Sequence, residues 1–164
     1  MTFFTFVRDP LDRFASTLFE LTRRHSTNRV GTKLWRLMRN VRGDDEIAMH
    51  ALNAWHEPPL DPHQQPQINF VMHNSSILPR LAYVGHVDSL INDLSALFYK
   101  FFTASAASFA ISHLMHTRSH KDAEYASDAV WINTSTLRKS TRAAVLNMYE
   151  LDRVWSHHAL QPLR

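Results

Sequence analysis

The strongest constraint on the fold is the joint between an apolar run and a proline near the start of the sequence. Residues 2–7 read TFFTFV, and this continuous run of β-branched and aromatic residues predicts a buried strand. Asp9 and Pro10 follow at once, and these residue types begin helices, as the N-cap and as the first helical residue. We therefore expect a strand that turns directly into a helix over about residues 10–24, with Arg8 at the joint.

This joint has the chemistry of an anion site. A helix start presents free backbone N–H groups and the positive end of a dipole, and a guanidinium binds phosphate in a bidentate manner. Ser16 lies two turns along the expected helix on its polar face, where its hydroxyl can reach a second phosphate oxygen. We interpret Arg8 and Ser16 as a phosphate site, with Asp9 as the N-cap and as the group that orients Arg8. The alternative is an ordinary strand-end arginine paired with Asp9 or Asp12.

The rest of the sequence predicts a mostly helical chain with few strands. Short extended segments are expected at 68–72 and 80–84, and residues 57–67 hold four of the seven prolines, which predicts a surface loop. Polar residues 117–128 are expected to be exposed. Capping residues and apolar spacing predict helices from Asp44 or Asp45 to about Trp55 and from Asp88 to about Phe101. A short helix is also expected over 34–41, a helix over the Ala/Ser-rich residues 103–116, and a final helix over about 137–156.

Composition limits the classes of protein to consider. The 164 residues suffice for one domain, and 45% hydrophobic with 20% charged residues is a globular balance. The net charge of +3 is too small to indicate a nucleic-acid-binding protein. The absence of cysteine excludes disulfides, thiolate metal sites and a cysteine nucleophile. No run approaches the ~18 apolar residues of a membrane span, and Arg8, Asp9 and Asp12 interrupt the only run that resembles a signal peptide.

The segment FTFVRDPLDRFAS, residues 4–16, resembles the 3′-phosphate-binding element of sulfotransferases that use 3′-phosphoadenosine 5′-phosphosulfate (PAPS). In that family an arginine at a strand end and a serine eight residues later bind the 3′-phosphate, and Arg8 and Ser16 match this spacing. The form RDPxxRxxS is most similar to Golgi carbohydrate sulfotransferases, such as those acting on chondroitin, dermatan and heparan chains.

Three later segments extend the resemblance in the same order along the chain. Pro66-Gln67 resembles a short PQ element, and residues 83–94 (YVGHVDSLINDL) resemble F/Y-V-G-x-x-E-x-L-x-x-D-L, with Asp88 where glutamate is usual. Residues 132–135 (INTS) and 149–152 (YELD) resemble a terminal N-x-S…Y-x-x-D element. An aromatic pair and a glycine often follow that aspartate; here the glycine is absent, and Trp155 is the candidate aromatic.

The resemblance implies an α/β sulfotransferase fold, related to P-loop nucleotide-binding folds, with residues 1–164 as a partial domain. The family's turn for the 5′-phosphosulfate, K/R-x-G-T/S-[ST], is expected upstream of this segment, and residues 30–33 (VGTK) are a poor substitute for it. The implied function is transfer of sulfate from PAPS to a carbohydrate hydroxyl, without a metal and with no catalytic residue assigned. We do not expect this portion to be active alone, and the implied compartment is the Golgi lumen if an upstream anchor exists.

Two basic segments are further candidates for binding anions. Arg138, Lys139 and Ser140 open the expected last helix and are candidates for covering the nucleotide; the alternative is a solvated helix start. The basic stretch over residues 23–42 is a candidate for contact with an anionic glycan; the alternative is a solvated charged face.

Other patterns carry weaker signals. His113, His116 and His120 would share a helix face and could hold a metal, but no carboxylate motif accompanies them. Asn74 and Asn133 begin glycosylation sequons, which suit a secretory protein and also arise by chance. Two rival interpretations stay open: an inactive remnant that still binds the nucleotide, and a mostly helical interaction module with no nucleotide site.

Overall fold

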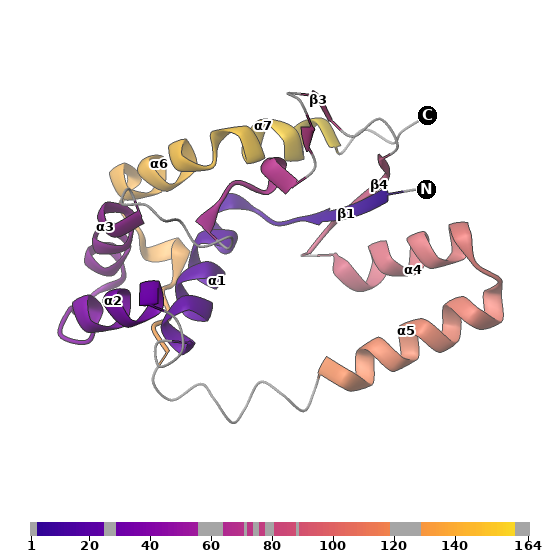
Figure 1. Cartoon of the computed structure of the whole chain (residues 1–164), viewed down its shortest axis with the longest axis horizontal. Helices are drawn as coiled ribbons and strands as arrows, with labels where there is room; N and C mark the ends of the chain where they lie inside the picture. The colour runs from indigo at the N-terminus through magenta and orange to yellow at the C-terminus, as the bar shows by residue number, and fades with distance from the viewer. Residues whose placement is uncertain are drawn as a thin grey trace.

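A computed structural model describes residues 3–24, 29–55, 64–70, 72–73, 76–77, 81–87, 89–118 and 129–159. Helices predominate and a small parallel sheet completes a mixed α/β fold, as the sequence predicts (Figure 1). Along the chain the elements are β1 (Phe3–Val7), α1 (Pro10–Arg23), α2 (Arg29–Met38), α3 (Asp44–Trp55), η2 (Gln67–Phe70), β2 (Met72–His73), β3 (Ser76–Ile77), β4 (Leu81–His86), α4 (Leu90–Phe101), α5 (Ala104–Arg118), η3 (Thr134–Thr136), α6 (Lys139–Met148) and α7 (Glu150–Ala159).

The predicted strand–helix joint is confirmed. β1 ends at Val7, and α1 begins two residues after Arg8, with Pro10 as its first residue. Asp9 is the N-cap, because its carboxylate accepts hydrogen bonds from the backbone N–H groups of Leu11 (2.9 Å) and Asp12 (3.3 Å). The local residue types therefore suffice to form this joint.

A hydrophobic core fills one end of the molecule. α1 packs against α2 and α6, and α3 packs against α2 and α6. The ring of Phe14 on α1 contacts that of Trp55 on α3, with centroids 4.7 Å apart. The fully or nearly fully buried side chains of this core include Phe14, Leu18, Leu21, Leu34, Met38, Ala48, Ala51, Trp55, Val145 and Tyr149.

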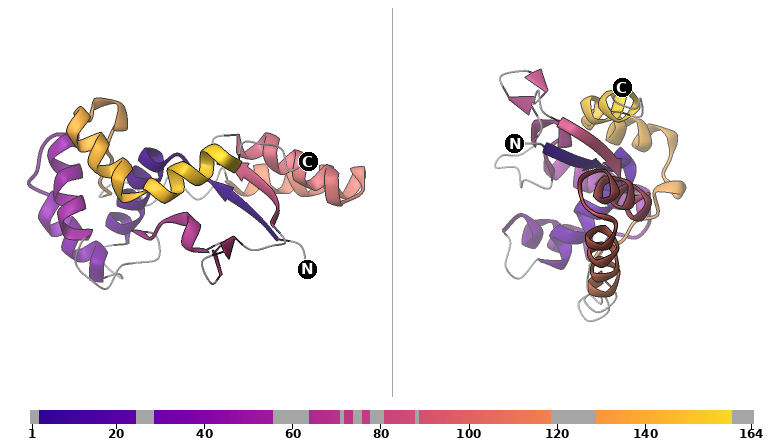
Figure 2. Two further views of the ribbon diagram at one scale, coloured as in Figure 1. Left: turned by 90° about the horizontal axis from the view of Figure 1, so that it is seen from above. Right: turned by 90° about the vertical axis from the view of Figure 1, so that its right-hand side faces the viewer.

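The sheet lies at the other end of α1 from most of this core. β1 pairs in parallel with β4, with Phe6 opposite Gly85 and Val7 opposite His86, so the predicted strand at 80–84 is confirmed and is slightly longer. The α4–α5 hairpin lies beyond the sheet, apart from α2 and α3 (Figure 2). It exposes several aromatic side chains, among them Phe109 at 75%.

The boundaries of two predicted helices are wrong. α2 covers Arg29–Met38 rather than 34–41, because Val30, Leu34 and Met38 form a stripe that packs on the core from the first turn onward. The predicted helix over 137–156 is two helices, α6 and α7, with Tyr149 between them. Tyr149 is fully buried with φ −110° and ψ 29°, and this break redirects α7.

Two other local predictions are also corrected. Residues 67–70 form the 3₁₀ helix η2 rather than a strand, because a distant carboxylate accepts the N–H groups of its first two residues. Asp44 and Asp45 are not caps of α3 but lie in its first turn, and they accept hydrogen bonds from the Thr136 hydroxyl and the Arg138 N–H.

Several predictions concern residues that the structure leaves undescribed: most of the proline-rich loop (57–63), the Asp88 cap, the Asn74 sequon, His120, and 119–128 of the polar segment. The predicted helix over 103–116 is confirmed as α5. Across the described ranges, no helix combines the length and apolarity needed to span a bilayer.

The close approach of β1 and β4 at Gly85 gives the first testable prediction. A Cβ at this position would lie 2.4 Å from Cε1 of Phe6, so Gly85→Ala forces the ring aside. We expect the free energy of unfolding to fall by about 1–3 kcal/mol, measured by urea denaturation. Phe6→Leu in the Gly85→Ala background should recover part of this loss. Equal stability of Gly85→Ala and the original chain would contradict the packing described here.

Candidate functional site

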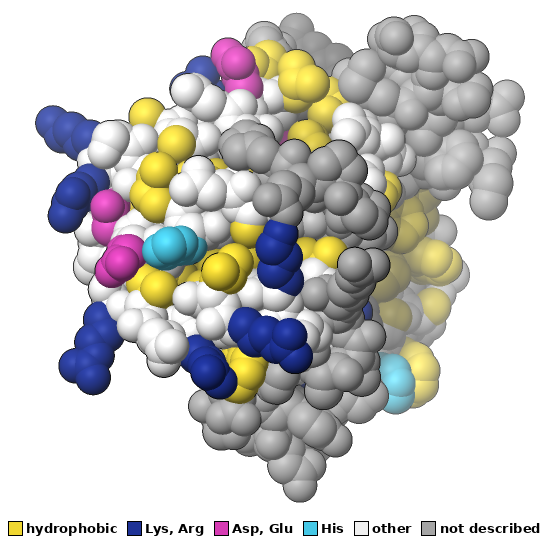
Figure 3. Space-filling view, turned by 60° about the vertical axis from the view of Figure 1, so that its left-hand side comes forward, with side chains coloured by type: hydrophobic (Ala, Val, Ile, Leu, Met, Phe, Trp, Pro, Cys, Tyr) yellow, Lys and Arg dark blue, Asp and Glu magenta, His cyan; other side chains and the backbone are white. Residues whose placement is uncertain are grey.

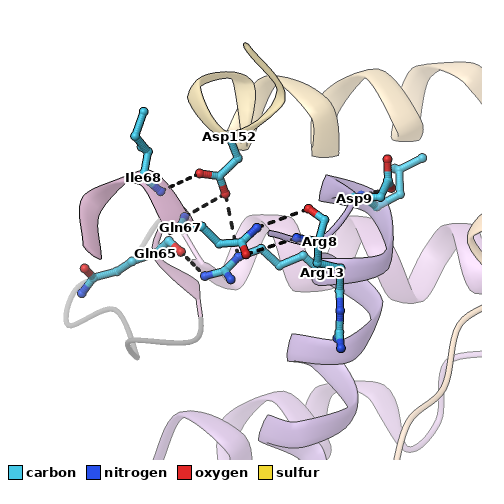
Figure 4. A network of polar contacts seen from close by, with 8 residues as sticks. Arg8, Asp9, Arg13, Gln65, Gln67, Ile68 and Asp152 are labelled. Atoms are coloured by element: carbon cyan, nitrogen blue, oxygen red, sulfur yellow. Dashed lines mark hydrogen bonds and ion pairs between the residues drawn. The ribbon is translucent and has the colours of Figure 1, made fainter. Parts of the chain in front are cut away.

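Three segments that carry the family resemblance meet at the joint between β1 and α1. Arg8 and Arg13 come from the first segment, Gln67 from the PQ element and Asp152 from the terminal YELD element (Figure 4). Direct hydrogen bonds and an ion pair connect them, although Arg8 and Asp152 lie near opposite ends of the sequence. The segments therefore form one polar cluster in space.

Gln67 holds the backbone of Arg8 from both sides. Its side-chain Oε1 accepts the Arg8 N–H at 3.3 Å, and its Nε2 donates to the Arg8 carbonyl at 3.2 Å. Arg8 follows the last residue of β1, where backbone groups need a partner outside the strand ladder. The Gln67 side-chain amide supplies that partner, and neither of the two hydrogen bonds involves the Arg8 side chain.

Asp152 is the buried anchor of the cluster. Its side chain is 2% exposed, and its two carboxylate oxygens accept the backbone N–H groups of Gln67 (2.8 Å) and Ile68 (2.9 Å). Nε of Arg13 lies 3.9 Å from Oδ2 of the same carboxylate. The break at Tyr149 places α7 so that this carboxylate lies against η2.

Arg13 is the second cation of the cluster. Its Nη2 donates to the carbonyl of Gln65, and its guanidinium carbon lies 5.8 Å from the centre of the Tyr149 ring. Sequence reasoning assigned no role to Arg13 or Asp152, although both occupy motif positions. In the sequence, Arg13 is visible as the second arginine of RDPxxRxxS and Asp152 as the aspartate of YELD. The spacing of the motifs does not show that these two residues pair with each other.

The Arg8 guanidinium is half-buried and makes no hydrogen bond or ion pair with any residue that the structure describes. Figure 4 shows the side chain directed away from Asp152, while its backbone faces Gln67. Within the described chain, neither Asp9 nor Asp12 pairs with it, which removes the alternative of an ordinary strand-end ion pair. Ser16 is half-buried on α1, and its hydroxyl likewise has no hydrogen-bond partner among the described residues.

The expected free amides at the start of α1 are not present. Asp9 accepts the N–H groups of Leu11 and Asp12 with its carboxylate and that of Arg13 with its carbonyl, and Pro10 has no N–H. The Asp9 charge also offsets the positive end of the helix dipole. The helix start therefore offers an anion no free N–H group from residues 10–13, and the side chains of Arg8 and Ser16 remain the candidate donors.

The three second-tier residues lie elsewhere. The Arg138 N–H donates to Oδ1 of Asp45 (2.8 Å), its Nε lies 3.5 Å from Oδ2 of Asp45, and Lys139 and Ser140 are exposed. A hydrogen bond from Thr141, followed by the Arg138 N–H, lowers the pKa of Asp45. The 10-residue helix α6 separates this end from Tyr149, a distance of about 15 Å. The structure does not bring Arg138, Lys139 and Ser140 to the Arg8 joint.

The basic stretch over residues 23–42 falls largely on α2. Lys33, Arg36 and Arg39 are exposed, and Lys33 and Arg36 line a hollow of about 580 Å³ together with Thr32 and Leu37. Figure 3 shows Lys and Arg side chains gathered on this side of the molecule around apolar ones. This face has the charge expected for contact with an anion, and it is separate from the Arg8 cluster.

Among the described residues no group of three potential metal ligands occurs, but His120 and the side chain of His116 lie outside them, so the histidine pattern stays a prediction. His113 stacks on Phe109, with rings 6.3 Å apart at 7°. His116 lies in α5 with an undescribed side chain. Asn133 is exposed, and its side-chain oxygen accepts hydrogen bonds from the N–H and hydroxyl of Ser135.

The YVGHVDSLINDL segment is structural in its described part. Oδ2 of Asp93 accepts the His86 N–H and the Ser89 hydroxyl, the latter at 2.7 Å, and so ties the end of β4 to the start of α4. Gly85 admits the Phe6 ring from the neighbouring strand. These positions need aspartate and glycine for the fold, independently of any ligand.

Comparisons with protein-family models, with curated proteins and with solved structures returned no match.

The buried Asp152 carboxylate gives the second prediction. Asp152→Asn removes the charge opposite Arg13 and replaces one acceptor oxygen by a donor, which leaves a buried N–H of Gln67 or Ile68 unsatisfied. We expect a loss of roughly 3 kcal/mol in the free energy of unfolding, measured by urea denaturation. The control Glu150→Gln, at an exposed position of α7, should change it by less than about 0.5 kcal/mol. Similar values for both variants would contradict the anchoring role.

Tyr149 gives a prediction for alkaline pH. Burial raises its pKa to about 12, the Arg13 charge opposes this shift, and the Asp152 charge adds to it. Because the folded-state pKa is raised, the stabilisation is fully present below the ordinary value of 10 and is lost as pH rises towards 12. We expect unfolding free energy to fall by roughly 2–3 kcal/mol across this window, and Tyr149→Phe to lack that component. Parallel pH profiles of the two chains in urea denaturation would contradict it.

Proposed function

We propose that this chain carries the 3′-phosphate-binding part of a PAPS-dependent sulfotransferase that acts on a carbohydrate hydroxyl. One observation carries the proposal: Arg8 is fixed through its backbone at a strand–helix joint, and among the described residues its guanidinium has no protein partner. Ser16 follows eight residues later on α1, as in the family motif. Two further motif segments supply residues to this arrangement: Gln67 of the PQ element bonds to the backbone of Arg8, and Asp152 of YELD bonds to the backbone of Gln67 (Figure 4).

The proposed reaction is sulfuryl transfer. The acceptor hydroxyl oxygen forms a bond to sulfur while the bond from sulfur to the 5′-phosphate oxygen breaks, and the electron pair leaves with adenosine 3′,5′-bisphosphate. A general base takes the hydroxyl proton. No described residue is assigned as this base.

Arg8 and Ser16 would bind the phosphate that does not react. Their contribution is to fix the nucleotide so that the reacting sulfur is held in position relative to the acceptor, which lowers the entropic cost of the transfer. The guanidinium fork suits two phosphate oxygens, and the hydroxyl supplies a third donor. The inactive-remnant alternative uses the same two contacts without turnover.

One observation favours a second candidate function, an interaction module without a nucleotide site. The α4–α5 hairpin exposes aromatic side chains: Tyr99, Phe101, Phe102 and Phe109. Exposed apolar groups gathered on one element are typical of surfaces that contact another molecule. This candidate predicts no preference for any nucleotide.

The proposal is tested by calorimetric titration with adenosine 3′,5′-bisphosphate and with adenosine 5′-monophosphate. We expect the full chain to bind the bisphosphate more tightly, because only this ligand carries the 3′-phosphate. Arg8→Ala should weaken bisphosphate binding roughly 10–100-fold and leave monophosphate binding unchanged. Arg8→Lys should recover only part of the affinity, since an ammonium cannot bind in a bidentate manner.

The matched control is Lys100→Ala, which removes one exposed cation from α4. It should leave both affinities unchanged. Equal affinity of the full chain for the two nucleotides would contradict the proposed function and favour the interaction module. Transfer of labelled sulfate from PAPS to a glycan then separates an active enzyme from an inactive remnant.

A further inference from the structure

We infer that Gln67 and Asp152 are positioning residues that set the Arg8 guanidinium for its anion through a relay of hydrogen bonds. The inference rests on the proposed function, which supplies the anion. Neither residue would touch the phosphate: the Gln67 side chain bonds to the backbone of Arg8, and the Asp152 carboxylate accepts the backbone N–H groups of Gln67 and Ile68. Their effect on a ligand would pass through Arg8.

The first step of the relay is the bond pair between Gln67 and Arg8. Two bonds to N–H and C=O of one residue restrain its φ and ψ, and these angles set the direction in which the side chain leaves the backbone. The restraint uses no atom of the guanidinium, so every guanidinium donor of Arg8 stays available on the side away from Gln67 (Figure 4). An arginine held in this way loses less conformational freedom when it binds.

The second step is the hold of Asp152 on Gln67. The carboxylate accepts the N–H groups of two consecutive residues at 2.8 and 2.9 Å, which fixes the first turn of η2 and with it the position from which the Gln67 side chain extends. Asp152 is 2% exposed, so these charge-assisted bonds are shielded from water. The orientation of Arg8 therefore depends on α7.

The third step is the compensation of charge by Arg13. A buried carboxylate near a phosphate site would repel the ligand, since like charges in a medium of low dielectric interact strongly. The Arg13 guanidinium lies 3.9 Å from Oδ2 of Asp152 and offsets its charge, while a second donor of Arg13 holds the Gln65 carbonyl. The relay thus brings Asp152 close without leaving an uncompensated negative charge.

The test compares Gln67→Met with the matched control Gln65→Met in the full chain. Methionine keeps the length of the side chain and removes both bonds to Arg8, whereas Gln65 contributes only its backbone carbonyl to the described cluster. The measured quantity is the ratio of dissociation constants for adenosine 5′-monophosphate and adenosine 3′,5′-bisphosphate. We expect Gln67→Met to lower this ratio at least about fivefold and Gln65→Met to leave it unchanged.

A double-mutant cycle then separates positioning from a general structural role. In the Arg8→Ala background, Gln67→Met should have no further effect on the ratio, because its effect passes through Arg8. Gln67→Glu keeps the acceptor for the Arg8 N–H and loses the donor to the carbonyl, so it should give an intermediate ratio. This second variant carries the test if Gln67→Met does not fold, as judged by circular dichroism.

The outcomes are distinguishable. A ratio that stays high in Gln67→Met, while Arg8→Ala abolishes it, overturns the inference and leaves the proposed function intact. Equal weakening of both nucleotides in Gln67→Met also overturns it, because a merely structural defect does not discriminate between them. A ratio near one in the original chain overturns the proposed function, and the inference falls with it.

Discussion

The buried carboxylate of Asp152 is the interaction on which the arrangement of the site depends. A carboxylate excluded from water is costly unless opposite charge and hydrogen bonds compensate it. Here the backbone N–H groups of Gln67 and Ile68 and the guanidinium of Arg13 do so, and the two N–H groups and the guanidinium come from distant parts of the sequence. By satisfying this one group, the chain brings α7, η2 and α1 together, and the segment that holds Arg8 takes its shape as a result.

The joint at Arg8 also connects two unlike halves of the molecule. On one side the helices α1, α2, α3 and α6 enclose a well-filled core, and on the other β1 and β4 form a sheet of only two strands (Figure 1). A parallel pair this small contributes little stability by itself. The close approach at Gly85 packs β4 against Phe6 of β1, the bonds of Asp93 hold the sheet to α4, and the polar cluster holds it to the helical half.

The sequence was most informative where structure is local. The position of the strand, the Asp9 cap and α1 were predicted correctly because adjacent residues determine them, and α5 and β4 were also predicted from their local composition. The expected burial of the strand was wrong in part, because Val7 is buried but Phe4 is 58% exposed on a sheet of only two strands. The apolar pattern predicted the wrong structure where contacts with residues distant in the sequence determine the local conformation. η2 was predicted as a strand because its apolar residues suit one, but the Asp152 carboxylate turns it into a helix from 85 residues away.

The candidate site divides in the same way. Arg8 and Ser16 were selected by spacing; the structure places Arg8 at the strand–helix joint and Ser16 two turns along α1, each side chain without a hydrogen-bond partner among the described residues. The expectation of free N–H groups at the start of α1 was wrong. Asp9, the residue that makes the helix start predictable, accepts the N–H groups of Leu11 and Asp12. Arg13, Gln67 and Asp152 were visible as motif letters, but the pairing between them follows from three-dimensional packing, which spacing does not encode.

The relay also fixes when the site can form during synthesis. Gln67 lies 59 residues after Arg8, and Asp152 lies a further 85 residues on. The series of hydrogen bonds that links Arg8 to Asp152 can therefore be completed only after Asp152 has been made. At ordinary rates of translation this interval is between roughly 7 and 30 s. For the first 59 residues of it Arg8 lacks Gln67, and for the remaining 85 Gln67 lacks the Asp152 carboxylate. In a nascent chain the residues of α1 are therefore all present well before the proposed anion site, which is completed only when Asp152 has been made.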